Sequence, residues 1–187
     1  MTRPPRALAL VAAAAALTTA VSGCGGGTKT ASADEWAGAL CGALAKLPDH
    51  AQALQTGFAA QAQRLQSDPK GARDDFATSL DEIAKDFSAG RKALDDAGRP
   101  KVDKGEEIQK TTLEGLDKVE KVFSDAADKV RKTEPTAAAL GAASTDVLKS
   151  LSAGFTEFGN TFDGLDSKSA EIKKAGETNA DCKKLNG

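Results

Sequence analysis

Apolar residues recur every three or four positions along most of the chain after residue 31, which is the spacing of one face of an α-helix. The first stripe consists of Trp36, Leu40, Leu44 and Leu47. Pro48 then interrupts the pattern, because proline cannot continue the hydrogen-bond ladder of a helix. We therefore expect the first helix to be kinked near Pro48 and to resume through Leu65.

Local start and stop signals mark the other helices. Ser32 and Glu35 form a capping box at the first start. Asp68 followed by Pro69 marks the second start, and Gly98 is suited to a left-handed stop. The last two starts are marked by Asp103 with Glu106, and by Pro135.

The remaining stripes lie on these segments, and the fourth runs with near-heptad spacing as far as Ile172. Its members are Leu140, Val147, Leu151, Phe155, Phe158, Phe162, Leu165 and Ile172. No alternating β pattern occurs. The sequence therefore predicts an all-α protein, an antiparallel up-down bundle of four long helices.

The third helix also carries acids four residues before bases on its polar face. The pairs are Glu106/Lys110, Glu114/Lys118, Asp117/Lys121, Asp125/Lys129 and Asp128/Lys132. We expect ion pairs within this helix, facing solvent.

The N-terminus has the pattern of an export signal. Arg3 and Arg6 precede an apolar run from Ala7 to Ala20, which is shorter than the roughly 20 residues of a membrane-spanning helix. An ordinary signal peptide, with Cys24 free or paired, would fit this pattern.

Val21-Ser22-Gly23-Cys24 resembles a bacterial lipobox. The resemblance implies that residues 1–23 are a lipoprotein signal peptide and that Cys24 is lipidated with diacylglycerol, carrying acyl chains such as palmitate. Two acyl chains anchor a protein stably. We expect residues 24–32 to be a flexible tether and residues 33–187 to be the helical domain, on the extracytoplasmic face of the cell membrane.

Charge narrows the range of partners. The chain has 25 basic and 27 acidic residues, and its net charge is −2. Because nucleic-acid binding and adhesion to anionic lipid both need concentrated Lys and Arg, we expect neither. The lipid on Cys24 would supply the membrane contact.

With Cys24 assigned to the lipid, Cys41 and Cys182 remain in an oxidising compartment. In an up-down bundle of four helices, the start of the first and the end of the fourth lie at the same end. We expect a Cys41–Cys182 disulfide; an intermolecular bridge or two buried thiols are the alternatives.

Candidate chemistry is sparse. His50 is the only histidine, and no phosphate-cradling glycine motif occurs. Adjacent carboxylates such as Asp74 and Asp75 point to different sides of a helix. We therefore expect no catalytic residue, no metal, no cofactor and no enzymatic activity.

The densest aromatic stripe is formed by Phe155, Phe158 and Phe162. Packing is one interpretation, and the wall of an apolar ligand cavity is the other. Gly154, Gly159 and Gly164 accompany the stripe and are compatible with a close helix contact, a bend or a pocket.

Three segments resemble the small secreted lipoproteins of actinobacteria: residues 35–44 around Trp36 and Cys41, residues 97–106, and residues 181–185 around Cys182. The resemblance transfers no catalytic residue. The lipobox, the cysteine pair and the lack of a reactive group of residues lead us to expect a non-enzymatic binding or interaction role at the cell envelope, with an envelope protein or a small ligand as partner. The alternative is a carrier of a small apolar ligand in a bundle cavity.

Overall fold

The computed structural model describes residues 29–185, apart from the side chains of residues 51, 55–62, 162–163, 166–167 and 185. The helices are α1 (Ala33–Leu44), α2 (Leu47–Ser67), α3 (Pro69–Ala97), α4 (Gly105–Lys132), α5 (Ala137–Lys168), α6 (Ala170–Thr178) and α7 (Ala180–Leu185). Two short strands, β1 (Thr30–Ala31) and β2 (Arg99–Pro100), pair in parallel. The prediction of an all-α protein is confirmed.

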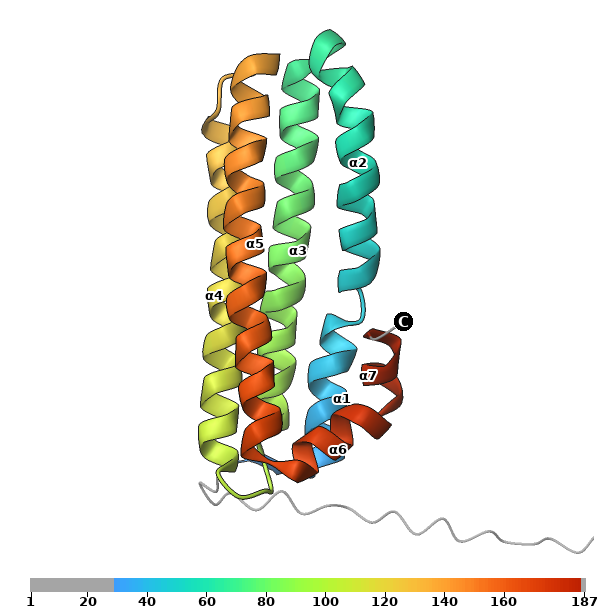
Figure 1. The fold of residues 1–187 in the computed structure, drawn as a ribbon, viewed down its shortest axis with the longest axis vertical. Coiled ribbons are helices and arrows are strands. Elements are labelled where there is room, and N and C mark those ends of the chain that lie inside the picture. Colours follow the sequence, from blue (N-terminus) through green and yellow to red (C-terminus); the bar gives the residue numbers. More distant parts are fainter. Residues whose placement is uncertain (1–28, 186–187) are drawn as a thin grey trace, which may run out of the picture.

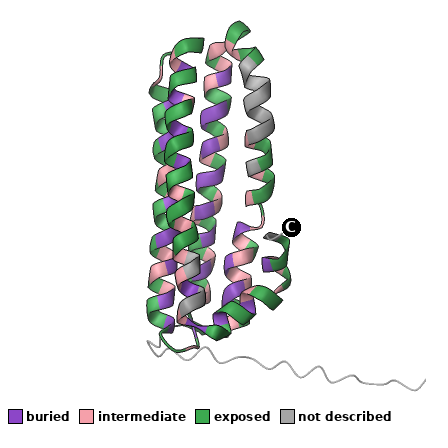
Figure 2. Cartoon of the chain, viewed as in Figure 1, coloured by how far each residue is buried: buried purple, intermediate pink, exposed green. Residues whose placement is uncertain are grey.

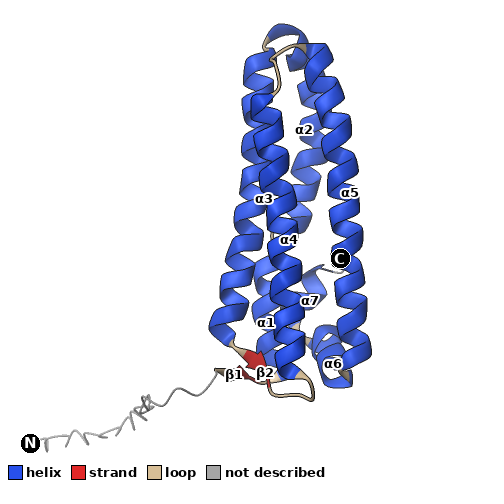
Figure 3. Ribbon diagram, turned by 90° about the vertical axis from the view of Figure 1, so that its left-hand side faces the viewer, coloured by secondary structure: helices blue, strands red, loops and turns tan. Residues whose placement is uncertain are grey.

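The long helices α3, α4 and α5 run along the length of the molecule, whereas α2 covers its upper part and α1 lies below α2 (Figure 1). At the lower end, α6 and α7 turn back beside α1 (Figure 1). We call this end the entry pole; it also holds β1, β2 and the connection from α3 to α4 (Figure 3).

The number of helices differs from the prediction, since residues 29–185 form seven helices instead of four. The first predicted helix is split between Leu44 and Leu47, and Pro48 lies in the first turn of α2, where its missing N–H leaves no bond unmade. The break therefore falls next to Pro48, as expected. The fourth helix ends at Lys168, because the Ser169 side chain accepts a bond from the N–H of Ile172 and starts α6.

The start signals were right for the first two helices. Ser32 and Glu35 form the capping box, and an Asp68 carboxylate oxygen accepts from the N–H of Gly71 at 2.9 Å. Asp103 does not cap the third predicted helix. Lys104 occupies the cap position of α4 with a φ of 55°, and the Asp103 side chain accepts a hydrogen bond from the N–H of Lys104. At the fourth, Thr136 caps α5.

The core lies mainly between α3 and α4, which make the most extensive contact among the described helices. Buried positions follow the inner side of both (Figure 2). Phe87 and Phe123 stack there with ring centroids 5.7 Å apart. The same core cluster contains the fully buried Leu80, Leu94, Ile108, Leu116 and Val130.

The prediction of a flexible tether over residues 24–32 is wrong for its last residues. Thr30 and Ala31 pair with β2, the carbonyl of Lys29 accepts from the N–H of Arg99 at 3.0 Å, and Ser32 caps α1. Residues 24–28, including Cys24, and the predicted signal peptide lie outside the described residues. Residues 29–32 thus belong to the folded domain.

The Cys41–Cys182 disulfide is confirmed, and it joins residues 141 positions apart. Cys182 is buried with Ala37 of α1 and Ala175 of α6. The Asn179 side chain also donates to a carboxylate oxygen of Asp34 at 3.3 Å. The bridge therefore holds α7 against α1 at the side of the entry pole.

Candidate functional site: a groove at the entry pole

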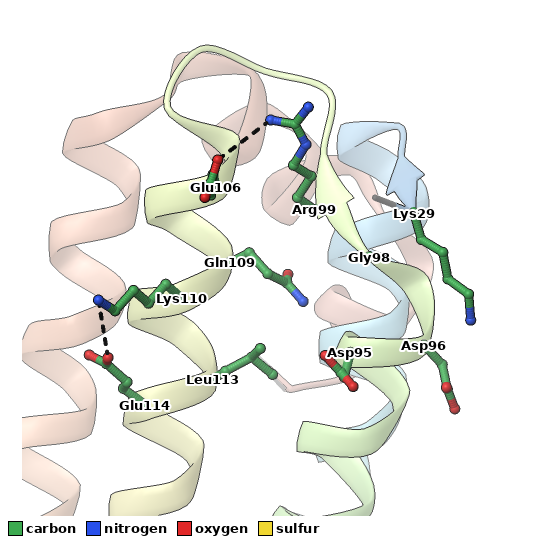
Figure 4. A pocket seen from close by; sticks show the side chains of 10 residues that line it. All are labelled: Lys29, Asp95, Asp96, Gly98, Arg99, Glu106, Gln109, Lys110, Leu113 and Glu114. Carbon is green, nitrogen blue, oxygen red and sulfur yellow. Dashed lines mark ion pairs between the residues drawn. The ribbon is translucent and has the colours of Figure 1, made fainter. Parts of the chain in front are cut away.

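A groove of about 550 Å³ lies between the last turn of α3 and the first turns of α4. Lys29 and Arg99 lie at its outer end, and Gln109 and Leu113 project into it from α4 (Figure 4). Asp95 and Asp96 come from the opposite wall, on α3 (Figure 4). We call this feature the entry-pole groove.

Gly98 allows the backbone of Lys29 to lie against the end of α3 beside the groove. Its φ is 80°, a conformation that side chains rarely adopt, and a Cβ at this position would collide with the carbonyl of Lys29. The sequence predicted a glycine stop here, but it gave no sign that the chain entering at Lys29 would lie against that stop.

A hydrogen-bond relay forms the inner wall of the groove. The indole N–H of Trp36 donates to the side-chain oxygen of Gln109 at 2.6 Å, and the Gln109 amide donates to the carbonyl of Leu94 at 2.9 Å. Trp36 is fully buried. Gln109 thus joins α1, α4 and α3 at the base of the groove while both polar ends of its amide are satisfied.

Replacing Gln109 by leucine is expected to lower the free energy of unfolding by about 1–3 kcal/mol, because the indole N–H of Trp36 would stay buried without an acceptor. Urea unfolding followed by tryptophan fluorescence measures this loss. Lys110→Leu is the matched control, since Lys110 is exposed and one residue away. Equal losses in both variants would contradict the assigned role of Gln109.

The rim of the groove carries charges of both signs, and several are paired. Arg99 lies 4.0 Å from Glu106, and Lys110 lies 3.9 Å from Glu114. The Lys92 ammonium donates to Asp96 at 2.7 Å, and this bond lowers the pKa of that carboxyl. A general acid needs a raised pKa near neutral pH, so Asp96 is poorly suited to proton transfer.

Other surface carboxyls share this direction of shift, with consequences for acid stability. Hydrogen bonds from the N–H of Gly71 and from Lys129 lower the pKa values of Asp68 and Asp146, respectively. Stability linked to a lowered pKa is complete above the pKa of the unfolded chain and is lost as the pH falls through the folded value.

We therefore expect the free energy of unfolding to fall between about pH 5 and pH 3, near and below the ordinary carboxyl range. Urea unfolding at a series of pH values measures it. In Asp68→Asn, which keeps a capping oxygen but cannot titrate, the fall should be shallower. A fall that is equally steep would rule out a contribution from Asp68.

The predicted aromatic site is only partly assembled. The ring of Phe158 packs edge-on against Phe87, and the ring of Phe155 packs edge-on against Phe123, both with centroids 5.6 Å apart. Phe155 is nevertheless 45% exposed. The side chain of Phe162 lies outside the described ones.

The space beside Phe158, between α4 and α5, measures about 20 Å³. A space of this size holds about one water molecule, whereas ligand pockets measure roughly 300–1,000 Å³. Gly154 lies in close contact with Val122 of α4, so this glycine marks a close helix contact.

His50, the single histidine, lies between α2 and α3, with its Nδ1 2.8 Å from Oδ2 of Asp86. Across residues 29–185, the described side chains contain no group of three or more histidine, cysteine or acidic residues arranged to hold a metal. In the same range, no helix is long and apolar enough to cross a membrane.

Comparisons with protein-family models, with curated proteins and with solved structures found no match to this chain. The functional interpretation therefore rests on the residues and their arrangement.

Proposed function

We propose that this chain is a lipid-anchored protein of the extracytoplasmic face of the cell membrane, with a non-enzymatic binding role at the cell envelope. In this proposal the domain is one antiparallel up-down bundle of four helical segments, in which α1 and α2 together form the first segment and α3, α4 and α5 form the other three. The partner would be an envelope protein or a small ligand that the entry-pole groove accommodates.

The observation that carries the proposal is the position of Lys29. It lies five residues after Cys24, and its backbone is hydrogen-bonded to β2 at the outer end of the groove. Five residues span at most about 18 Å when fully extended. A lipid on Cys24 would therefore hold the entry-pole groove close to the membrane surface.

The lining of the groove supports binding of a polar partner. Gln109 and Leu113 present a mixed polar and apolar wall, while the rim offers cations and carboxylates together. A partner with both signs of charge, such as a peptide segment, can exchange its charges with the loose Arg99–Glu106 and Lys110–Glu114 pairs. Such exposed pairs contribute little to stability, so opening them costs little.

The anchoring part of the proposal is tested by Cys24→Ala. We expect the variant to be released from the membrane fraction into the medium, because the acyl chains would be missing. Ser22→Ala is the matched control, since it keeps a small residue before Cys24 and should stay anchored. Retention of Cys24→Ala in the membrane would refute the lipid anchor.

The binding part is tested by photo-cross-linking in the native envelope. A photoreactive residue in place of Lys110, beside the groove, should capture a partner that the same residue in place of Lys132 does not capture. Lys132 is also exposed and lies at the far end of α4. Identical products from both positions would speak against a binding role for the groove.

The apolar-ligand carrier receives no support from the described side chains. Phe155 and Phe158 contact other aromatic rings, and the space next to Phe158 is too small for an apolar ligand. We therefore do not extend this alternative.

A further inference from the structure

Two side chains project into the entry-pole groove from opposite walls, Asp95 from α3 and Leu113 from α4 (Figure 4). Leu113 is partly buried, so it offers an apolar surface, whereas Asp95 is exposed and offers a carboxylate. A group that lies between them can therefore contact a hydrocarbon side and a negative charge at the same time. The charges around Asp95 decide which sign of ligand this place accepts.

The other acids that line the groove are already paired with cations. These pairs are Asp96 with Lys92, Glu106 with Arg99, and Glu114 with Lys110. Among the described residues, no side chain forms a hydrogen bond or an ion pair with the Asp95 carboxylate. Asp95 is therefore the acid of the groove whose charge is left for a ligand.

Two lysines lie near Asp95 without pairing with it. The Lys92 ammonium donates to Asp96 at 2.7 Å, and the charge of Asp95 acts on it only through space. Lys29 points away from the groove in Figure 4. It contributes, after Lys92, to the lowered pKa of Asp96, so its charge also acts on that carboxyl. The groove thus keeps one uncompensated negative charge, at Asp95.

The end of α3 adds to this negative charge. A helix carries a partial negative charge at its C-terminus, so cations stabilise the last turn and acids do not. The last turn of α3 contains no basic residue, and Asp95 and Asp96 lie in it. Positions that break a local rule of this kind are expected at functional sites. The helix end and the Asp95 carboxylate attract a cation to the same place.

We infer that the entry-pole groove binds a basic side chain, a lysine or an arginine, of a peptide segment of its partner. The cation pairs with the Asp95 carboxylate. The alkyl stem of the same side chain lies along Leu113, since such stems pack on apolar surface while their charged ends stay in water. The inference rests on the proposed binding role of the groove and states which chemistry the groove selects.

A divalent metal ion fits the same place less well. Calcium and magnesium ions take at least about six ligands, most of them oxygen atoms. Among the described side chains, no group of three histidine, cysteine or acidic residues is arranged to hold a metal. A single free carboxylate beside an apolar side chain matches one cationic side chain with a hydrocarbon stem.

Trp36 provides the readout for a binding test, because it is the only tryptophan of the chain and its indole N–H is bonded to Gln109 at the base of the groove. The full chain with Cys24→Ala is titrated with blocked pentapeptides, and the NMR signal of this N–H is followed. A pentapeptide with a central lysine or arginine should shift the signal, with a Kd on the order of 1 mM. A central norleucine, which keeps the stem without the charge, should bind about two- to fivefold more weakly.

Asp95→Asn removes the charge and keeps the size of the side chain. It should weaken binding of the lysine pentapeptide by about two- to fivefold, and it should not lower the free energy of unfolding, because an acid at a helix C-terminus does not stabilise the helix. Asp103→Asn is the matched control, since Asp103 is exposed in the connection from α3 to α4 and does not line the groove. It makes the same change in net charge and should leave binding unchanged.

The inference would be overturned if neither basic pentapeptide shifts the signal, if the norleucine pentapeptide binds equally well, or if Asp95→Asn and Asp103→Asn have equal effects. Butylammonium tests the source of the cation. If it binds as tightly as the lysine pentapeptide, the ligand is a free amine and the peptide part of the inference is wrong. Capture of a partner by the photoreactive residue at position 110 would support the binding role of the groove in each of these cases, so the two proposals can fail separately.

Discussion

Replacing Cys41 and Cys182 together by alanine is expected to lower the free energy of unfolding by about 2–5 kcal/mol. The bridge joins residues 141 positions apart and so closes most of the described part of the chain into one loop. In the chain-entropy description, a loop of this length restricts the unfolded chain by about 5 kcal/mol, which is an upper figure. For a domain of this size the melting temperature should fall by about 4–20 °C.

Thermal and urea unfolding with and without a reducing agent provide the measurement and its control. Reduction should destabilise the wild-type protein by the same amount and leave the double variant unchanged. After reduction, α7 should be the first helix to detach, because α7 is held to α1 mainly at Cys182 and Asn179. Hydrogen exchange should therefore rise first in α7. An unchanged melting temperature after complete reduction would exclude a stabilising role for the bridge.

Truncating Phe87 to alanine is expected to cost about 3–5 kcal/mol of unfolding free energy. Phe87 is fully buried, its ring stacks on Phe123 of α4, and the edge of Phe158 of α5 meets it. Removing the ring leaves a cavity at the junction of three helices and takes away both aromatic contacts. Urea unfolding followed by circular dichroism measures the loss.

Phe155→Ala is the matched control, because the same side chain is removed from the same aromatic cluster. Phe155 is 45% exposed and contacts Phe123 edge-on. Phe155→Ala should therefore lower the free energy of unfolding by less than about half as much as Phe87→Ala does. Equal losses at the two positions would show that the core does not depend on the α3–α4 stack. A small loss from Phe155→Ala would agree with an exposed surface position on α5.

Much of the local structure could be predicted from the sequence because it depends on neighbouring residues. The capping box of Ser32 and Glu35, the Asp68 cap and the break next to Pro48 each follow from bonds within one or two turns. The apolar periodicity likewise predicted most of the buried positions, although Phe155 of the fourth stripe is 45% exposed. Asp103 and Pro135 were the exceptions, because Lys104, with its positive φ, occupies the cap position of α4 and Thr136 occupies that of α5.

The partners of the charged residues on α4 could be predicted only in part from the sequence. The sequence predicted pairs within α4, and Asp128 with Lys132 is one that forms, at 3.9 Å. Lys118 and Lys129 instead reach Glu157 and Asp146 of α5. The spacing of residues cannot show that a neighbouring helix brings a carboxylate closer than the same helix does.

By itself, the sequence determined the helical class and most helix boundaries, because periodicity and caps are properties of the order of residues. It favoured the pairing of Cys41 with Cys182 but left an intermolecular bridge and two buried thiols open, and the structure decided between them. Only the tertiary structure decided where distant segments meet. It brought Lys29 against Gly98, joined Trp36 to Leu94 through Gln109, and formed the entry-pole groove from α3 and α4. It also left Leu148 and Phe155 exposed, because burial depends on which neighbour covers a face and not on how apolar that face is.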